Sequence, residues 1–564
     1  MNQTRLPRLL LVWAAAALST ATLWPGSAHS AGAAPPGGTN QTSGQDDLGG
    51  ARVIVKYKAQ GSVMRAAASA HGPARGPQHA SSLASRTGLA LTDGRVVDHH
   101  TQVVRGAPGT SSAVLAARLA ADPDVDYAVP DGRRHAMAVP NDPLFAASGT
   151  ISPAAGQWYL RFPDATFVSA INAVGAWDIS TGSATVVVAD IDTGVRFDHP
   201  DLANKLHPGY DFITDLADAA DGDGPDADAT DPGDWTSADE CGFGSPASTS
   251  SWHGTQTAGL IGAQTNNALG MASVGRNVML LPVRVLGKCG GLDSDIITAM
   301  LWAGGLTPDP GGNPNPHPAR VLNLSLGGGG SCSLAYQDAI TRLTAAGVVI
   351  VVSAGNDRGL AVSTPANCPG VIAVAGVRNV GTKVGFSNVG AEVTIAAPGG
   401  NCINTGETDP CLYPILSTTS SGSQAAASST YTDSIDFAVG TSFSAPLVAG
   451  TAALMISARP ELTPAQVKSM LQATARAFPD TSTDPSVPQC HTPDGTTQLE
   501  CLCTTSTCGA GLLDAAAAVA ATLPPAPAAA ADSGGGALQI GWLAGLALAV
   551  SALARRRRVA PARR

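Results

Sequence analysis

Five short apolar runs of valine, leucine, isoleucine and alanine recur in the middle of this chain, and they constrain its fold more than any other feature. The runs are Val186–Ala189, Val278–Arg284, Val321–Ser325, Val348–Ser353 and Val371–Val377. Continuous apolar runs of this length are typical of parallel strands that are buried on both faces. Because stretches of helical character separate them, we expect an α/β fold with a parallel sheet and helices on both of its faces.

The length and charge of the chain limit its organisation and its partners. With 564 residues it is too long for one domain of ordinary size. Hydrophobic residues make up 44% of the chain, which is enough apolar material for a buried sheet. The net charge of −10 argues against a nucleic-acid partner and against a basic membrane-binding face, and an aromatic content of 4% leaves little for base stacking.

One of the five runs leads to an acidic residue at the place where α/β sheets hold their ligands. The segment Thr185–Val195 reads Thr-Val-Val-Val-Ala-Asp-Ile-Asp-Thr-Gly-Val, so a buried strand would deliver Asp192 to its carboxyl end. In open α/β sheets this edge carries the ligand or the reacting groups. Taken alone, an aspartate there is also what an ordinary turn would show.

Two further motifs place a possible base and a hydroxyl at the starts of helices. His253-Gly254-Thr255 opens one helical segment, and Gly440-Thr441-Ser442 precedes the apolar run Leu447–Ile456. The first turn of a helix leaves backbone N–H groups unpaired, so an oxyanion that forms beside Ser442 would find donors in place. In the order Asp192, His253, Ser442 the chain would supply an orienting carboxylate, a general base and a nucleophile.

With these motifs in this order, the chain resembles the subtilisin-like serine proteases. Two more segments fit that family. Val321–Gly328 resembles the strand whose backbone pairs with an extended substrate, and Val352–Asn356 resembles the segment that presents the oxyanion-hole asparagine. The resemblance covers roughly residues 140–522 and departs from the family at Gln256–Thr257, where many relatives carry His-Val or His-Cys.

The resemblance implies a subtilisin-like fold and endoproteolysis through an acyl-enzyme. Ser442 would attack the peptide carbonyl while His253 takes its proton and Asp192 orients the imidazole. Asn356 would donate to the oxyanion. The substrate would bind at Ser325, Leu326 and Gly327. The implied enzyme is a monomer that acts on proteins and peptides, and the alternative is a catalytically silent surface protein that uses the same scaffold for binding.

The first 50 residues carry export features. Arg5 and Arg8 precede the apolar segment Leu9–Leu23, which is too short to span a membrane, and small residues follow it. Residues 1–30 therefore have the pattern of a secretory signal peptide. Residues 31–50 are rich in Gly, Pro, Ser and Gln and should be a flexible leader.

Residues 51–137 should form a small α+β domain of their own. Arg52–Tyr57 and Val125–Val129 have strand character, and Ser112–Ala121 has helical spacing. By resemblance this unit is an inhibitory propeptide, which occupies the substrate cleft and is released by self-cleavage between residues 133 and 140. An independent binding module is the alternative.

The catalytic domain would then span residues 138–523, followed by a linker at 524–536 and a basic-ended apolar segment at 537–564. The apolar part is just long enough for a helix to cross a bilayer, with its arginines on the cytoplasmic side. Together with the glycines at 534–536, it resembles the sorting tails that Gram-negative bacteria cut during export. Such a tail implies transient membrane contact before secretion; a permanent anchor is the alternative.

Calcium is the implied cofactor, because hard oxygen ligands that converge from loops are what this ion prefers. By resemblance to the thermostable branch of the family, one ligand set is Asp142, Asp201, Gln264, Asn267, Leu269 and Met271. A second candidate lies in a loop crowded with carboxylates, at Asp221, Asp223, Asp226, Asp228, Asp231 and Asp234. Such like charges repel one another unless they bind a cation or are solvated, so a solvated acidic loop is the alternative there.

Ten cysteines, an even number in an exported chain, indicate structural disulfides. The expected pairs are Cys241 with Cys289, Cys332 with Cys368 and Cys402 with Cys411. The partners of Cys490, Cys501, Cys503 and Cys508 cannot be assigned from the sequence, and a zinc site is the alternative for these four.

Overall fold

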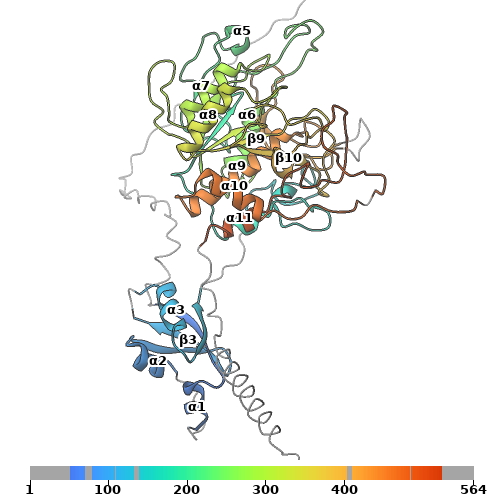
Figure 1. The fold of residues 1–564 in the computed structure, drawn as a ribbon. Helices are drawn as coiled ribbons and strands as arrows, with labels where there is room; N and C mark the ends of the chain where they lie inside the picture. The colour runs from blue at the N-terminus through green and yellow to red at the C-terminus, as the bar shows by residue number, and fades with distance from the viewer. Residues whose placement is uncertain are drawn as a thin grey trace, which may run out of the picture. The chain divides into compact units, whose positions relative to one another are not determined.

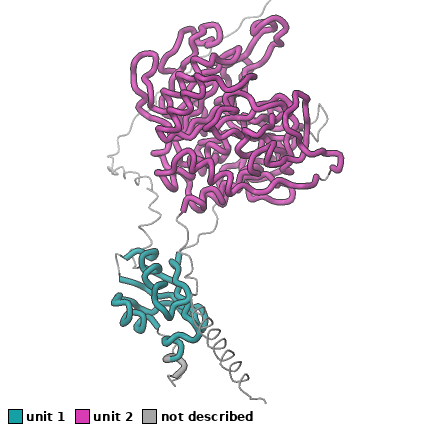
Figure 2. The backbone as a smooth tube through the Cα atoms, in the orientation of Figure 1, with its two compact units in different colours: residues 1–133, 529–564 teal, residues 134–528 magenta. Residues whose placement is uncertain are grey.

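The computed structural model describes residues 51–69, 79–107, 110–132, 139–402, 410–482 and 484–523. The predicted signal peptide, leader, linker and C-terminal segment lie outside the described residues, as does most of the predicted cleavage junction. The chain separates into two compact units, one of residues 1–133 with 529–564 and the other of residues 134–528 (Figure 2). The functional assignment of these parts stays a prediction.

The described part of the smaller unit is an antiparallel sheet with helices. Its strands are β1 (Arg52–Tyr57), β2 (Leu91–Val96), β3 (Thr101–Gly106) and β4 (Val125–Pro130), and its helices are α1 (Ser62–Ser69), α2 (Ala80–Thr87) and α3 (Ser112–Ala120). The strand order β2-β3-β1-β4 leaves β4 at one edge. Leu115 and Leu119 of α3 pack on Val53 and Val55 of β1, so the apolar spacing of α3 builds this core.

The larger unit is built on a seven-stranded parallel sheet with the order β11-β10-β9-β8-β5-β7-β6 (Figure 1). Its strands are β5 (Val187–Asp192), β6 (Tyr210–Asp211), β7 (Met279–Arg284), β8 (Val321–Leu324), β9 (Val349–Ser353), β10 (Ile372–Val377) and β11 (Val393–Pro398). Five of these strands coincide with the five predicted apolar runs. The other two, β6 and β11, were not predicted, because β6 is two residues long and β11 mixes Thr, Ala and Pro into its apolar run.

Helices cover both faces of this sheet, which confirms the predicted fold class. On β5, Val188 packs in one core with α6 (His253–Gly262) and α9 (Thr441–Ala458). Ala189 and Ile191 point to the opposite core, which contains α7 (Asp293–Ala303) and α8 (Leu334–Ala345). The remaining elements are η1 (Trp158–Leu160), α4 (Ala173–Trp177), α5 (Leu216–Ala219), α10 (Pro464–Ala473), α11 (Ala515–Ala520) and a hairpin of β12 (Thr418–Ser420) with β13 (Ser429–Tyr431).

Helix α9 is the one helix among the described residues that is long and apolar enough to cross a membrane. It is 18 residues long and 83% buried inside the larger unit. It packs against α6 on one side and follows the sheet on the other (Figure 1). Its apolar character is therefore that of a core helix.

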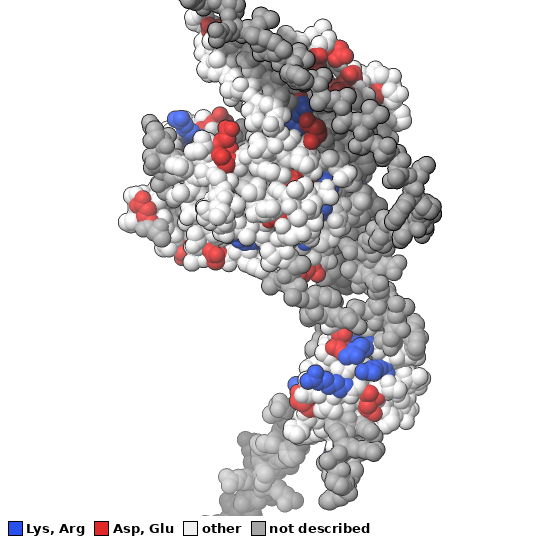
Figure 3. All heavy atoms as spheres, turned by 180° about the vertical axis from the view of Figure 1, so that it is seen from behind, with Lys and Arg blue, Asp and Glu red and all other residues white. Residues whose placement is uncertain are grey.

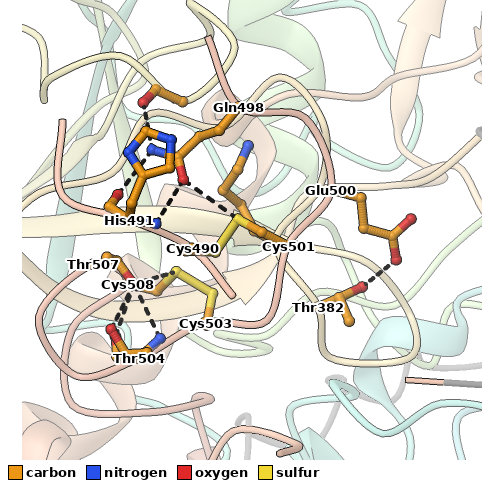
Figure 4. Close-up of a disulfide and its surroundings, with 12 residues drawn as sticks. Thr382, Cys490, His491, Gln498, Glu500, Cys501, Cys503, Thr504, Thr507 and Cys508 are labelled. Atoms are coloured by element: carbon orange, nitrogen blue, oxygen red, sulfur yellow. Dashed lines mark hydrogen bonds between the residues drawn. A yellow bond between two sulfur atoms is a disulfide. The ribbon is translucent and has the colours of Figure 1, made fainter. Parts of the chain in front are cut away.

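All ten cysteines form disulfides. Three pairs are the predicted ones: Cys241–Cys289, Cys332–Cys368 and Cys402–Cys411. The four that the sequence could not assign pair as Cys490–Cys501 and Cys503–Cys508 (Figure 4). A zinc ligand must be a thiolate, and a disulfide sulfur is not one, so the zinc alternative for these four is wrong.

Charged side chains are sparse on the face of the larger unit seen in Figure 3. Acidic and basic groups appear there as small separate groups on a mostly uncharged surface. The chain as a whole carries 33 Lys and Arg against 43 Asp and Glu. The described surface in this view is therefore formed mostly by residues other than Lys, Arg, Asp and Glu.

Candidate active site

Asp192 and His253 are in direct contact at the carboxyl end of the sheet. Asp192 is the last residue of β5 and is 1% exposed, and His253 is the first residue of α6. The Nδ1 of His253 donates to Oδ1 of Asp192 at 2.7 Å, which leaves Nε2 free to accept a proton. Burial lowers the pKa of His253, but the charge and the hydrogen bond of Asp192 outweigh it and raise that pKa above its ordinary value.

The Asp-Thr-Gly and His-Gly-Thr motifs fit each other closely, which explains their residue types. A Cβ atom on Gly254 would lie 2.2 Å from the carbonyl oxygen of Gly194, so only glycine is accommodated there. The Thr193 hydroxyl accepts from the Gly254 N–H at 3.0 Å and donates to Oδ2 of Asp231 at 2.7 Å. Through this hydrogen bond to Gly254, Thr193 connects the end of β5 to the start of α6. The sequence did not reveal this role.

Ser442 lies in the first turn of α9, and its hydroxyl bonds to the segment that follows β8. Its Oγ donates to the carbonyl oxygen of Ser325 at 3.1 Å. Within the described residues, no hydrogen bond joins this hydroxyl to the imidazole of His253. The ring of the next residue, Phe443, lies 5.6 Å from the imidazole, centroid to centroid. Transfer of the Ser442 proton to His253 thus requires rotation of the serine side chain about its Cα–Cβ bond.

A proline inside α9 explains how the peptide of Ser442 is held. Pro446 has no N–H, so the carbonyl oxygen of Ser442, four residues earlier, loses its usual helical donor. The hydroxyl of Ser325 replaces this donor: it donates a hydrogen bond to the carbonyl oxygen of Ser442 at 2.7 Å. Ser325 and Ser442 are therefore joined by two reciprocal hydrogen bonds, one from each hydroxyl.

Asn356 offers amide hydrogens beside Ser442. Its Oδ1 accepts from the backbone N–H of Thr441 at 3.0 Å and from the Thr441 hydroxyl at 2.9 Å. These two bonds fix the orientation of the amide and leave its Nδ2 without a protein acceptor among the described residues. The N–H of Ser442, in the first turn of α9, is likewise unpaired within that part of the chain. Two donors are thus available to a developing oxyanion.

Two cavities flank these residues. One of about 580 Å³ is lined by Ser442, Asn356 and the three residues predicted to bind substrate, Ser325, Leu326 and Gly327. The other, of about 490 Å³, is lined by His253, Trp252 and Phe443. The backbone of Gly327 has no hydrogen-bond partner within the described residues and is free to pair with an extended peptide. Sequence reasoning missed Asp293 and Asp357, which also line the first cavity.

The first predicted calcium set is assembled around two buried carboxylates. Asp142 is 3% exposed and Asp201 is 0% exposed. Oδ1 of Asp201 accepts from the Asn267 side chain at 2.7 Å, and its Oδ2 accepts from the Met271 N–H at 3.0 Å. Gln264 and Leu269 lie in the same loop and donate their N–H groups to the carbonyl of Asp201 and the side chain of Asn267.

These two carboxylates fit a bound cation. Within the described residues, no Lys, Arg or His side chain forms an ion pair with Asp142 or Asp201. Burial raises the pKa of Asp142, and the nearby Asp201 adds to that effect. Buried carboxylates without a counter-ion are unfavourable, and a divalent cation with hard oxygen ligands would supply one.

The carboxylates of the acidic loop, residues 221–234, do not lie together around one point in the same way. Asp221 forms an ion pair with the buried Arg284 of β7. Asp231 accepts from Thr193, and Asp234 accepts from the N–H and hydroxyl of Ser251 at 2.6 Å each. The other three predicted ligands do not join them: Asp226 and Asp228 accept backbone N–H groups two residues on, and Asp223 donates its own to Asp221.

No three carboxylates among the described residues come within reach of one ion. The guanidinium of Arg284 takes part of the role that the sequence suggested for a second calcium ion, because it also pairs with Asp211. We therefore do not propose a metal in this loop.

Several known proteins are similar to this chain. Residues 183–503 match the model of the subtilase family, Peptidase_S8. An extracellular protease of Xanthomonas campestris pv. campestris is 44% identical over 367 residues, which are 65% of this chain and 58% of that protein. Subtilisin DY of Bacillus licheniformis is 32% identical over 302 residues, 53% of this chain and 86% of its own length.

A protease of Pseudoalteromonas arctica has a similar solved structure, with a TM-score of 0.57 and 42% sequence identity. The match covers 68% of this chain and all of that structure. An extracellular basic protease of Dichelobacter nodosus is 39% identical over 64% of this chain. The chain spans less than two thirds of the length of this relative and of the one from Xanthomonas, 56% and 58% respectively.

Proposed function

The chain belongs to the subtilase family of serine proteases, and we propose that it is a secreted endopeptidase that uses Ser442, His253 and Asp192 as its catalytic triad. The observation that carries this proposal is the 2.7 Å contact between His253 and Asp192, beside the ring of Phe443, the residue that follows Ser442. The names of the extracellular relatives support secretion.

In the proposed reaction, a substrate strand pairs with the free backbone at Gly327, and its carbonyl carbon comes to lie beside Ser442. The serine side chain rotates from Ser325 to His253, and Nε2 takes the hydroxyl proton as Oγ attacks. Asp192 stabilises the imidazolium that forms. The amide of Asn356 and the N–H of Ser442 receive the oxyanion, the peptide bond breaks as His253 protonates the leaving amine, and water then hydrolyses the acyl-enzyme.

We also propose that the smaller unit acts as the inhibitory propeptide. In support, its edge strand β4 ends at Pro130, shortly before the predicted cleavage junction at 133–140. Removal of the segment at 537–564 would complete release from the cell. A fluorophosphonate probe tests the central claim: it should label Ser442 and block casein hydrolysis, and a protein that is not labelled would be a binding scaffold instead.

Asn356→Ala should lower turnover by about 10²–10³-fold and change KM little, which is the loss known for the corresponding change in a subtilisin. The reason is that the amide acts on charge that develops only in the transition state. Steady-state kinetics on a chromogenic peptide would measure this. The control Asn277→Ala removes an exposed amide that bonds only Thr181, and it should leave kcat unchanged. Equal effects of both changes would contradict the role of Asn356.

We propose calcium at Asp142 and Asp201, where it would supply the counter-charge that stabilises the surrounding loops. Chelation by EDTA should lower the melting temperature by about 5 °C, as expected when a ligand at roughly 100 times its Kd is removed. Differential scanning fluorimetry with and without calcium would show it. Asp201→Asn should abolish this calcium dependence, and the exposed control Asp198→Asn should keep it. A melting temperature that chelation leaves unaltered would remove the calcium proposal.

A further inference from the structure

A second carboxyl group lies directly behind the proposed triad. Asp190 precedes Asp192 by two residues on β5, so both side chains leave the strand on the same face, the one covered by α6 and α9. The Asp190 side chain belongs to a residue that is only 2% exposed, and no ion pair reaches it within the described residues. The mechanism above gives this buried group no role.

Asp190 connects the helix of the base to the strand beside the nucleophile. Its Oδ2 lies 2.8 Å from the hydroxyl of Thr257, which is one turn after His253 on α6. Its Oδ1 accepts from the side-chain amide of Asn323 on β8 at 2.9 Å. That amide nitrogen also lies 3.0 Å from the Ser325 hydroxyl, which in turn holds the carbonyl of Ser442.

Burial beside the carboxylate of Asp192, without an ion-pair partner among the described residues, favours the neutral form of Asp190. The hydrogen bonds around Asp190 accommodate the proton of that neutral form. The Thr257 hydroxyl has one hydrogen but faces three acceptors: Oδ2 of Asp190 at 2.8 Å and the carbonyl oxygens of His253 and Gly254 at 3.2 Å each. If Asp190 carries a proton, it donates to Thr257, and Thr257 donates to one of the helix carbonyls. Burial raises the pKa of Asp190 to about 8, and the charge of Asp192 acts in the same direction.

Few titratable groups face Asp190. They are Asp192 on its own strand and His253 on α6. Its neighbour on β8 is the neutral Asn323, its neighbour on β7 is Pro282, and α9 contains no titratable side chain. A negative charge on Asp190 would therefore act mainly on Asp192 and His253, and the protonated imidazole of His253 is the one cation that faces it among the described residues.

We propose that Asp190 is a positioning residue for the proposed hydrolysis: as a neutral carboxylic acid it holds the helix of His253, through Thr257, against the strand that seats Ser442, through Asn323 and Ser325. It does not touch the substrate. In its neutral form it leaves Asp192 as the single negative charge beside the imidazole. The proposal also explains the departure from the family at residue 257, because a valine or cysteine there would give Asp190 no hydroxyl partner.

The test compares Asp190→Asn with Asp190→Ala in the mature, calcium-loaded enzyme, with active sites counted by fluorophosphonate labelling. Asparagine imitates the neutral acid, so kcat at pH 7 should stay within about 3-fold, whereas alanine should lower kcat about 10-fold at unchanged KM, as for the loss of one or two buried hydrogen bonds. Thr257→Val should cause a similar loss, and combining it with Asp190→Ala should add little.

The pH profile separates this role from simple structural support. In the wild type, kcat should fall as Asp190 ionises above about pH 8, and Asp190→Asn should lack this descent. A descent that persists in Asp190→Asn, or a loss with asparagine as large as with alanine, would overturn the proposal. If Asp190→Ala does not fold, the asparagine profile alone decides.

An infrared measurement keeps this inference distinct from the proposed function on which it rests. At pH 6 the wild type should show the carbonyl stretch of a neutral carboxylic acid that is missing in Asp190→Asn. Absence of that band would refute the protonated Asp190 even in an active protease. Its presence in a protein that fluorophosphonate does not label would instead refute the proposed hydrolysis, and with it the positioning role.

Discussion

Replacing Ser442 with alanine should abolish casein hydrolysis and leave the protein with residues 51–137 still attached. Turnover should fall by about 10⁶-fold, the order observed when a subtilisin loses its nucleophile. The physical reason is that alanine has no oxygen that could attack the substrate carbonyl and form the acyl-enzyme. Peptide hydrolysis, fluorophosphonate labelling and mass spectrometry of the purified chain would measure the three consequences.

A matched control lies two residues further along the same helix. Ser444 is also buried, and its hydroxyl donates to the carbonyl of Pro398 at 3.1 Å instead of facing the site. Ser444→Ala should therefore retain labelling and self-processing, with a loss of stability of about 1 kcal/mol for one hydrogen bond. If Ser442→Ala were still processed in a protease-deficient host, self-cleavage would be ruled out, although hydrolysis of other proteins by Ser442 would not.

Replacing Asp192 with asparagine should lower kcat by about 10⁴-fold near neutral pH without unfolding the protein. Asparagine keeps the size of the side chain but presents an amide where His253 needs an acceptor. The imidazole then loses the bond that fixes its tautomer and the charge that stabilises its protonated form. The measurement is kcat on a peptide substrate, with far-ultraviolet circular dichroism as the check on folding.

The effect of Asp192 on the pKa of His253 also predicts the direction in which the pH profile should shift. Asp192 raises the pKa of His253, so wild-type kcat/KM should rise through a pKa above the ordinary 6.5 of histidine as the base loses its proton. In Asp192→Asn that limb of the profile should move to lower pH. The exposed Asp198, which pairs with Arg196, supplies the control: Asp198→Asn should leave both the rate and the profile unaltered. A limb that stays in place in Asp192→Asn would mean that Asp192 does not set the pKa of the base.

The features that could be predicted from the sequence are those with a local signal. The five apolar runs predicted five strands. Short motifs that contain glycine indicated Asp192, His253, Asn356 and Ser442 as candidate site residues. The strand β6 gave no such signal, because two residues show no periodicity. Contacts between distant segments were also hidden: Thr257 meets Asp190 from 67 residues away, and Asn323 meets it from 133.

The acidic loop shows how a correct observation led to an unsupported ligand set. Its carboxylates do repel one another, and the sequence analysis proposed calcium as the compensating positive charge. The compensating charge comes instead, in part, from Arg284, which lies 63 residues after Asp221 on a buried strand. A single sequence does not show that an arginine in an apolar run turns toward a loop so far away.

The burial of α9 from Thr441 to Ile456 bears on how the protein loses activity. The hydrogen-bonded amide protons beyond its first turn should exchange with solvent only when the surrounding unit opens as a whole, since both the sheet and α6 must separate from the helix first. Ser442 is therefore carried by one of the last segments to loosen. Loss of the proposed activity should then follow the rate at which the entire unit opens cooperatively and not fraying at the cleft.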